Sequence, residues 1–147
     1  MAVTVKKAVL WRKEVENRPG ELANTLEPLV GAGADLKLVM GYRYGPGESK
    51  AAIELYPVAG RKALAAARQA GLSASTIPTL VVEGDDKPGL GHAIAKALAD
   101  AKINLAFVIA QVIGRRYSAV FGFESEADAA QAARLIKKAA PAARKSR

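Results

Sequence analysis

The chain contains no cysteine, only one histidine, and few aromatic residues among its 147 positions. Without cysteine, the sequence excludes disulfides, thiolate catalysis and thiolate metal sites. His92 has no second histidine with which to complete a metal site, so we expect it to face solvent. No Ser-His-Asp set, phosphate-binding glycine loop or metal motif is present. We therefore predict no catalytic residues, no metal and no cofactor, and we expect that the protein is not an enzyme.

Long hydrophobic runs are also missing. Half of the residues are apolar, but no stretch of 18 or more is uninterrupted, which excludes a helix that spans a membrane. The segment 1–7 lacks the apolar region and cleavage site of a signal peptide. We expect a soluble, cytoplasmic protein with no membrane partner.

Charge of one sign is not concentrated in either half. Residues 1–77 and 78–147 each contain 11 basic and 7 acidic residues, a net charge of +4 per half and +8 in total. Five of the basic residues lie at the C-terminus, where 141–147 is predicted to be a basic, flexible tail. Because the rest of the chain is only weakly basic, we do not expect nucleic acid as a partner.

The most informative feature present is an internal repeat. Asn17-Arg18-Pro19-Gly20 is followed 69 positions later by Asp86-Lys87-Pro88-Gly89, and the same offset relates Leu29 to Leu98 and Leu36 to Leu105. A fixed offset of this kind indicates a duplicated structural unit. We therefore predict two modules, at 1–77 and 78–140. Halves this small have modest cores, so we expect the modules to pack together.

Each copy shows the pattern strand, helix, strand, strand, helix. Pro19 is predicted to occupy the first position of its helix, where a missing amide costs nothing. Alternation and helical periodicity predict strands and helices in the first copy at 3–15, 19–30, 35–44, 50–56, 59–70 and 72–77. The second copy repeats them at 79–85, 88–101, 103–113, 117–123 and 126–138, but lacks the last strand.

The missing strand predicts an open sheet edge in the second copy. Exposed edges tend to pair with other chains. In addition, 105–110 is apolar at odd and even positions alike, so we expect this strand to be hidden on both faces. Both features predict a homo-oligomer, with Phe107 at the contact.

The repeated motif resembles the ACT domain, a regulatory module that binds amino acids. The resemblance rests on x-Pro-Gly-x-Leu entering a helix, followed by Ala-x-Ile/Leu-x-Leu into a strand, and it covers 5–77 and 79–138. It is closest to stand-alone tandem ACT proteins, and it implies an α+β fold of two ferredoxin-like βαββαβ modules, the second without its last strand. The turn at 42–48 departs from the pattern. The ligand-binding residues implied are Asn17, Arg18, Pro19, Gly20, Glu21, Leu22, Asp86, Lys87, Pro88, Gly89, Leu90 and Asn104.

The residues themselves also favour a site at the helix starts. Amides in a first helical turn lack internal partners and attract a carboxylate. Gly20 and Gly89 allow a ligand to approach the backbone, and Asn17 or Asp86 can accept hydrogen bonds from an ammonium group. Leu22 or Leu90 would form an apolar wall. The alternative is that each motif is only a good turn and helix start.

The two helix starts differ in charge. Glu21 follows the first glycine and would repel a carboxylate, whereas the second glycine is followed by Leu90. This argument favours the second site, although Asp85 and Asp86 also concentrate negative charge there. Substituting Gly20 or Gly89 by valine is expected to block binding and to leave most of the fold intact.

A second class of function is an RNA-binding protein. The sequence 119–130 resembles the third strand and following helix of an RNA-recognition module, in which exposed aromatics stack on bases. However, Phe121 and Phe123 are expected to face the core, and the strand 79–83 offers no aromatic residue. We therefore expect a regulatory or sensor protein that binds a small amino acid between its modules and regulates a protein partner in trans.

Overall fold

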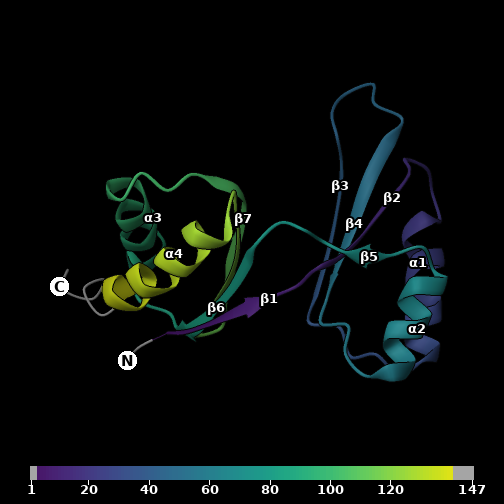
Figure 1. Cartoon of the computed structure of the whole chain (residues 1–147), viewed down its shortest axis with the longest axis horizontal. Helices are drawn as coiled ribbons and strands as arrows, with labels where there is room; N and C mark the ends of the chain where they lie inside the picture. Colours follow the sequence, from purple (N-terminus) through teal and green to yellow (C-terminus); the bar gives the residue numbers. More distant parts are fainter. Residues whose placement is uncertain (1–2, 141–147) are drawn as a thin grey trace. The chain divides into compact units, whose positions relative to one another are not determined.

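The structure, a computed structural model, describes residues 3–140, so the predicted tail 141–147 lies outside the described residues. The chain divides into two compact units (Figure 1). One contains residues 9–76 and is called the first module. The other contains residues 77–140 and also the N-terminal segment 3–8, and is called the second module.

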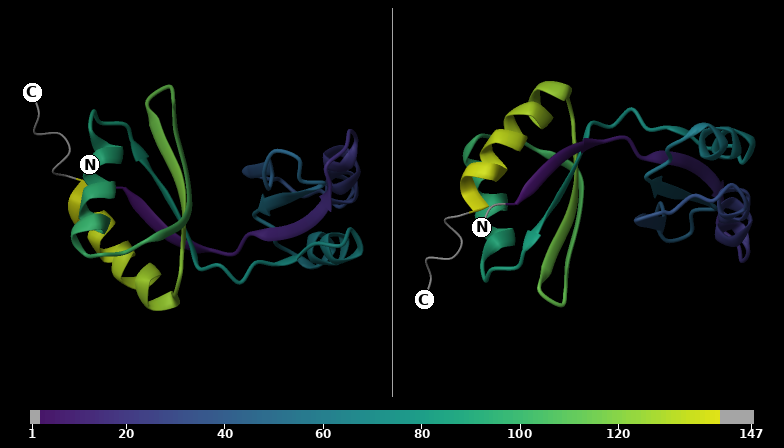
Figure 2. Two further views of the ribbon diagram at one scale, coloured as in Figure 1. Left: turned by 90° about the horizontal axis from the view of Figure 1, so that it is seen from above. Right: turned by 90° about the horizontal axis from the view of Figure 1, so that it is seen from below.

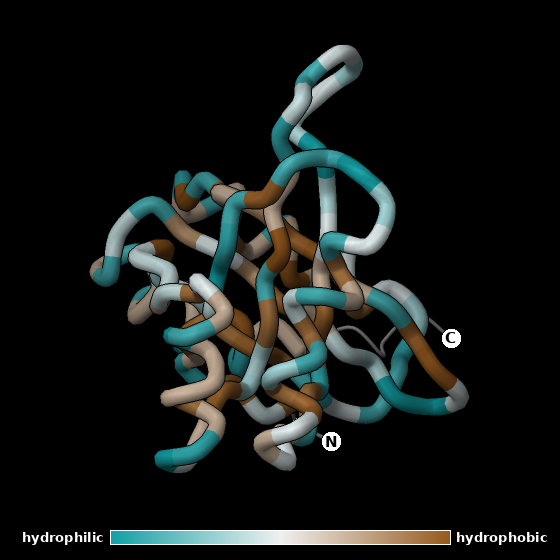
Figure 3. The backbone as a smooth tube through the Cα atoms, turned by 90° about the vertical axis from the view of Figure 1, so that its right-hand side faces the viewer, coloured by the Kyte–Doolittle hydropathy of each residue, from teal (hydrophilic) through white to brown (hydrophobic). Residues whose placement is uncertain are grey.

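The first module has the order β2, α1, β3, β4, α2, β5. Its antiparallel sheet has the strand order β3-β4-β2-β5, and Val15, Ile53 and Leu55 form a core with Leu29 of α1 and Ala67 of α2. The tip of the β3–β4 hairpin is hydrophilic (Figure 3). The elements are β2 (Trp11–Glu16), α1 (Glu21–Gly31), β3 (Leu38–Arg43), β4 (Lys50–Tyr56), α2 (Arg61–Gln69) and β5 (Ser73–Ala74).

The second module repeats this arrangement with the strand order β1-β6-β8-β7. Its two helices lie on the same face of the sheet (Figure 2). The first module runs βαββαβ along the chain, whereas the second runs βαββα and takes its fourth strand, β1, from the N-terminal segment. The two sheets have equivalent strand orders, and the predicted α+β, ferredoxin-like fold is confirmed. The elements are β1 (Thr4–Ala8), β6 (Thr79–Asp85), α3 (Leu90–Asp100), β7 (Leu105–Ile113), β8 (Arg116–Phe123) and α4 (Glu126–Ala139).

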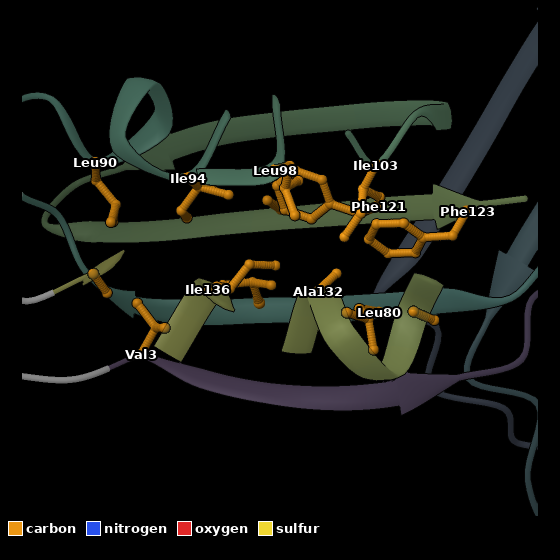
Figure 4. Packing of buried hydrophobic residues seen from close by; sticks show 14 of the residues in the cluster. Val3, Leu80, Leu90, Ile94, Leu98, Ile103, Phe121, Phe123, Ala132 and Ile136 are labelled. Atoms are coloured by element: carbon orange, nitrogen blue, oxygen red, sulfur yellow. The ribbon is translucent and has the colours of Figure 1, made fainter. Parts of the chain in front are cut away.

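Alternation along the strands builds the core of the second module. Phe121 and Phe123 of β8 point toward the helices, as expected, and are 4% and 1% exposed. They pack in one cluster with Ile94 and Leu98 of α3 and Ile136 of α4 (Figure 4). Rings in the core cannot stack on bases, so the main sequence argument for RNA recognition is removed.

The predicted strand 3–15 is wrong, because it is two strands. β1 pairs antiparallel with β6, whereas β2 belongs to the first module, and Val9–Leu10 separates them. β1 takes the position of the missing fourth strand and buries Val3 against the core. The open edge predicted beside the first strand of the second copy is therefore closed, and residues 3–8 belong to the second module. Periodicity could not show this, because pairing with a strand 75 positions away is not a local signal.

The other edge of the second sheet, β7, is open in the described residues. It was expected to be hidden on both faces, but Val108, Ile109, Val112 and Ile113 are 51%, 42%, 47% and 67% exposed. Phe107 is partly buried instead, and its ring lies over Gly122, whose added Cβ would come within 2.2 Å of it. Phe107 therefore packs within its own module. No helix of the described residues is long and apolar enough to cross a membrane.

Candidate ligand-binding site

The first helix start is shaped by the backbone of the loop between β2 and α1. The Asn17 amide donates to the Ser49 carbonyl at 2.8 Å, which fixes the loop to the following hairpin. Gly20 is left-handed, with φ +93°, and no side chain caps the helix. The helix begins at Glu21, so Pro19 precedes the cap and does not occupy the first helical position as predicted. No side chain caps the first-turn amides, although the Glu21 amide donates to the Arg18 carbonyl at 3.5 Å.

This loop borders a pocket of about 270 Å³, called the helix-start pocket. Four of the predicted residues line it, and the rest of its wall comes from the ends of β2, β3 and β4. Pro19 and Gly20 lie in the loop but do not line the pocket. The lining residues are Val15, Glu16, Asn17, Arg18, Glu21, Leu22, Gly41, Tyr42, Arg43, Ala51, Ala52 and Ile53.

Both carboxylates that line the pocket are paired. Glu21 accepts a hydrogen bond from Arg18 Nε at 2.6 Å, and Glu16 accepts one from Lys50. The hydrogen bond from Lys50, together with its charge, lowers the pKa of Glu16 below its usual value. Because Arg18 neutralises Glu21, the repulsion that the sequence predicted at this helix start is reduced.

Arg43 is the lining cation with no ion pair among the described residues. It is exposed at the end of β3. An exposed guanidinium beside the amides of a helix start can bind a carboxylate through two parallel hydrogen bonds. Asn17 is also exposed, and its side-chain oxygen can accept from an ammonium group. The pocket therefore offers groups for both charges of an amino acid.

The second helix start has the same backbone but different surroundings. Gly89 is left-handed, with φ +84°, and α3 begins at Leu90, so Pro88 also precedes the cap. Leu90 is 2% exposed and belongs to the core, whereas Leu22 is 43% exposed. Lys87 is also buried, at 8% exposed. Asp86 is exposed, and its amide donates to the Arg115 carbonyl at 2.7 Å.

One residue explains much of this difference. In the first module, Ala51 of β4 lies opposite Val15 of β2. Gly84 of β6 is the repeat equivalent of Val15, and the residue opposite it in β8 is Tyr117. Tyr117 is 5% exposed and packs in the same cluster as Leu90. At the second helix start Tyr117 and Leu90 are therefore buried. The equivalent positions of the first module hold Ala51 and Glu21, which is paired with Arg18.

Asn104 lies away from the helix start of its own module. It precedes β7, and its side chain donates to Glu124 at 3.0 Å, just after β8 ends. Asp85 pairs with Arg116 at the start of β8. Asn104 and the loop of Asp86 consequently lie at opposite ends of the sheet.

Sequence reasoning missed the strand residues of the pocket. The most informative is Gly41 in β3, because a glycine inside a strand often marks the close approach of a ligand or backbone. A Cβ built at Gly41 has no neighbour closer than 4.0 Å, so the missing side chain leaves free space. This signal was present in the sequence, inside the alternating segment 35–44.

A polar network holds the β3 side of the pocket. Tyr42 donates to Glu54 at 2.8 Å, Tyr44 donates to Glu14 at 2.9 Å, and Arg12 donates to Tyr44 at 2.6 Å. Burial, and then the hydrogen bond to Glu54, raise the pKa of Tyr42. Glu54 is 1% exposed, and its Oε1 has no hydrogen-bond partner in the described residues. The network fixes Tyr42, which lines the pocket.

A larger cavity of about 490 Å³ lies elsewhere in the first module and contains none of the predicted residues. Its one carboxylate, Asp35, is paired with Lys37 at 2.8 Å. The lining residues are Ala32, Gly33, Ala34, Asp35, Pro57, Ala59, Gly60, Arg61, Lys62 and Ala63. Among the described residues, no group of three or more His, Cys, Asp or Glu could hold a metal ion, and His92 is exposed.

The chain is similar in fold to several solved structures. It matches protein BT0572 from Bacteroides thetaiotaomicron with a TM-score of 0.70 and 12% identity over 88% of each chain. It matches the regulatory subunits of aspartate kinase from Thermus thermophilus and Thermus flavus with TM-scores of 0.62 and 0.59, each at 17% identity over 95% of this chain and 97% of the other. The chain thus shares the tandem ACT-type fold of these structures. No family model and no curated protein matches the chain.

The resemblance seen in the repeated motif is thus confirmed at the level of the fold. The similar aspartate kinase chains are regulatory subunits, and this chain spans nearly their whole length. At identities of 12–17%, the similarity establishes the shared ACT-type fold and does not identify a ligand.

Proposed function

We propose that the chain is a non-catalytic regulatory or sensor protein that binds a free amino acid in the helix-start pocket of the first module. The observation that carries this proposal is the pocket itself, which combines an unpaired Arg43, an exposed Asn17 and apolar walls. This choice differs from the sequence argument, which favoured the second helix start. There Leu90 and Tyr117 are buried where the ligand would have to bind.

The proposed mechanism uses the two ends of the amino acid separately. The ligand carboxylate binds Arg43 and the first-turn amides of α1 that no side chain caps, and the ammonium group donates to Asn17. Leu22 closes over the ligand side chain. Binding then stabilises the first module, and a protein partner responds in trans, because the described residues contain no catalytic constellation. The proposal also includes that the protein acts in the cytoplasm.

Self-association through β7 is a second part of the proposal. β7 is an edge strand of nine residues that carries no charge, and apart from Gln111 its exposed side chains are apolar on both faces. Antiparallel pairing of two copies would satisfy its free backbone groups. Phe107→Lys would not test this contact, because Phe107 packs on Gly122 within its own module. Ile113→Lys, at a residue that is 67% exposed, should weaken assembly and leave the module folded. Light scattering that shows a monomer at tens of micromolar would refute self-association.

A thermal-shift screen with each common amino acid tests ligand binding. A ligand at about 100 times its dissociation constant stabilises the folded protein by roughly 2.7 kcal/mol, which raises the midpoint by several degrees. Ala51→Tyr places in the first module the tyrosine that the second module has at the equivalent position, and it should remove the ligand-induced rise in melting temperature. A flat profile for every amino acid at millimolar concentration would contradict the proposal.

A further inference from the structure

The walls of the helix-start pocket are apolar where the ligand side chain would lie. Val15 and Ile53 are 7% and 4% exposed and belong to the core of the first module. Leu22, 43% exposed, lines the same pocket, and a Cβ at Gly41 would have no neighbouring atom closer than 4.0 Å. A ligand side chain that enters this space is removed from water and gains about fourfold in affinity for each buried CH₂ group.

The charges of the pocket argue against an ionised ligand side chain. Glu21 and Glu16 are already bound by Arg18 and Lys50, so no unpaired carboxylate lines the pocket to receive a second ammonium group. Arg43 is one unpaired cation, so it can bind the α-carboxylate of the ligand, and no further unpaired cation among the described residues lines the pocket to bind a side-chain carboxylate. Burial of an unpaired charge is costly.

The volume limits the size of the ligand. At about 270 Å³ the pocket lies just below the range of about 300–1,000 Å³ that is typical of sites for drug-sized ligands. A volume of this size suits a small aliphatic side chain better than an aromatic ring.

We propose that the pocket selects amino acids with a branched aliphatic side chain, namely valine, leucine or isoleucine. This inference rests on the proposed function, and it adds the class of ligand. Leucine should bind roughly 60-fold more tightly than alanine, because it buries three more carbons. Lysine, glutamate and phenylalanine should each bind more weakly than leucine.

Calorimetry with leucine, alanine, lysine, glutamate and phenylalanine tests the inference. Gly41→Val places a side chain in this space, and its Cβ would have no neighbouring atom closer than 4.0 Å. This variant should lose at least tenfold in leucine affinity and much less in alanine affinity. Ala110→Val adds the same kind of side chain at the equivalent repeat position of the second module and should change neither affinity. Arg43→Gln should weaken leucine and alanine by the same factor.

The outcomes separate the two proposals. If no amino acid binds, the proposed function itself fails. If lysine, glutamate or phenylalanine binds more tightly than leucine, amino-acid binding stands and the inference about the side chain is overturned. If Gly41→Val binds leucine as tightly as the unmodified protein, while its unliganded melting temperature is unchanged, the side chain does not occupy the space over Gly41 and the inference is also overturned.

Discussion

The two modules begin their first helices with the same Pro-Gly motif and the same left-handed glycine, yet the surroundings of the two helix starts differ. In the first module the loop borders a pocket of about 270 Å³. In the second module Leu90 and Tyr117 are buried in the core at the equivalent positions. Duplication has preserved the fold in both copies. The difference in the site depends on the size of a few side chains.

This comparison shows why the motif alone is weak evidence for binding. The glycine and proline of the motif serve the turn in both modules, because Gly20 and Gly89 need a positive φ whether or not a ligand binds. The sequence-based tests Gly20→Val and Gly89→Val would therefore strain the backbone as well as block a ligand. Gly41 has no such requirement, so substitutions there report on the pocket.

The largest expected effect comes from opening the second helix start. Tyr117→Ala removes a buried ring, and because the surrounding core relaxes only partly, we expect a loss of about 3 kcal/mol in the free energy of unfolding. Urea unfolding measures it. Tyr44→Ala, at a ring that is 41% exposed, should lose much less. A loss under about 1 kcal/mol for Tyr117→Ala would show that this ring does not close the second helix start.

A smaller effect is expected where β1 completes the second sheet. A Cβ at Gly84 would lie 2.9 Å from Val3 Cγ1 and 3.1 Å from Val3 Cα. Gly84→Ala should therefore push β1 away from the sheet and cost about 1–3 kcal/mol. Hydrogen exchange at the amides of β1 should become faster. Gly91→Ala, where the added Cβ meets nothing within 4 Å, is the control. Unchanged exchange in Gly84→Ala would argue against β1 as the fourth strand.

The ends of the two first helices offer a paired test. Gly33 and Lys102 occupy equivalent positions with φ of +80° and +61°, and both are followed by the same hydrogen bond back into the helix. A lysine in this region is strained, so Lys102→Gly should stabilise by about 0.5–1 kcal/mol and Gly33→Lys should destabilise by about 1 kcal/mol. Thermal unfolding measures both. A loss of stability in Lys102→Gly would contradict the equivalence of the two turns.

The smallest effect concerns an ion pair that both modules share. Glu16 pairs with Lys50 and Asp85 pairs with Arg116, across equivalent strands. Because the hydrogen bond to Lys50 lowers the pKa of Glu16, this group contributes stability above its unfolded pKa of about 4.5 and loses it as the pH falls through the lower folded value. Glu16→Gln should flatten the loss of stability on acidification. An unchanged acid profile in this variant would show that the pair contributes nothing.

Much of the fold was predictable, because the repeat, the Pro-Gly turns and the strand alternation are local signals. The strands Lys50–Tyr56 and Thr79–Asp85 were predicted with their observed bounds. The break at Val9–Leu10 could not be predicted, because residues 3–15 are strand-like throughout. The segment is divided only because β1 pairs with β6, which is distant in the sequence. Of the residues that line the pocket, those of the loop belong to the motif that the sequence analysis identified. Gly41 and Ala51 leave space by having little or no side chain, and this becomes visible only after the strands are in register.

The most direct test of the central claim is a titration of the isotope-labelled protein with leucine, followed by the backbone amide resonances of both helix starts. We predict that the amides of Leu22, Gly41 and Arg43 shift and that those of Leu90 and Gly91 do not. Shifts confined to Leu90 and Gly91, or present equally in both modules, would contradict the claim that only the first helix start is an open binding site.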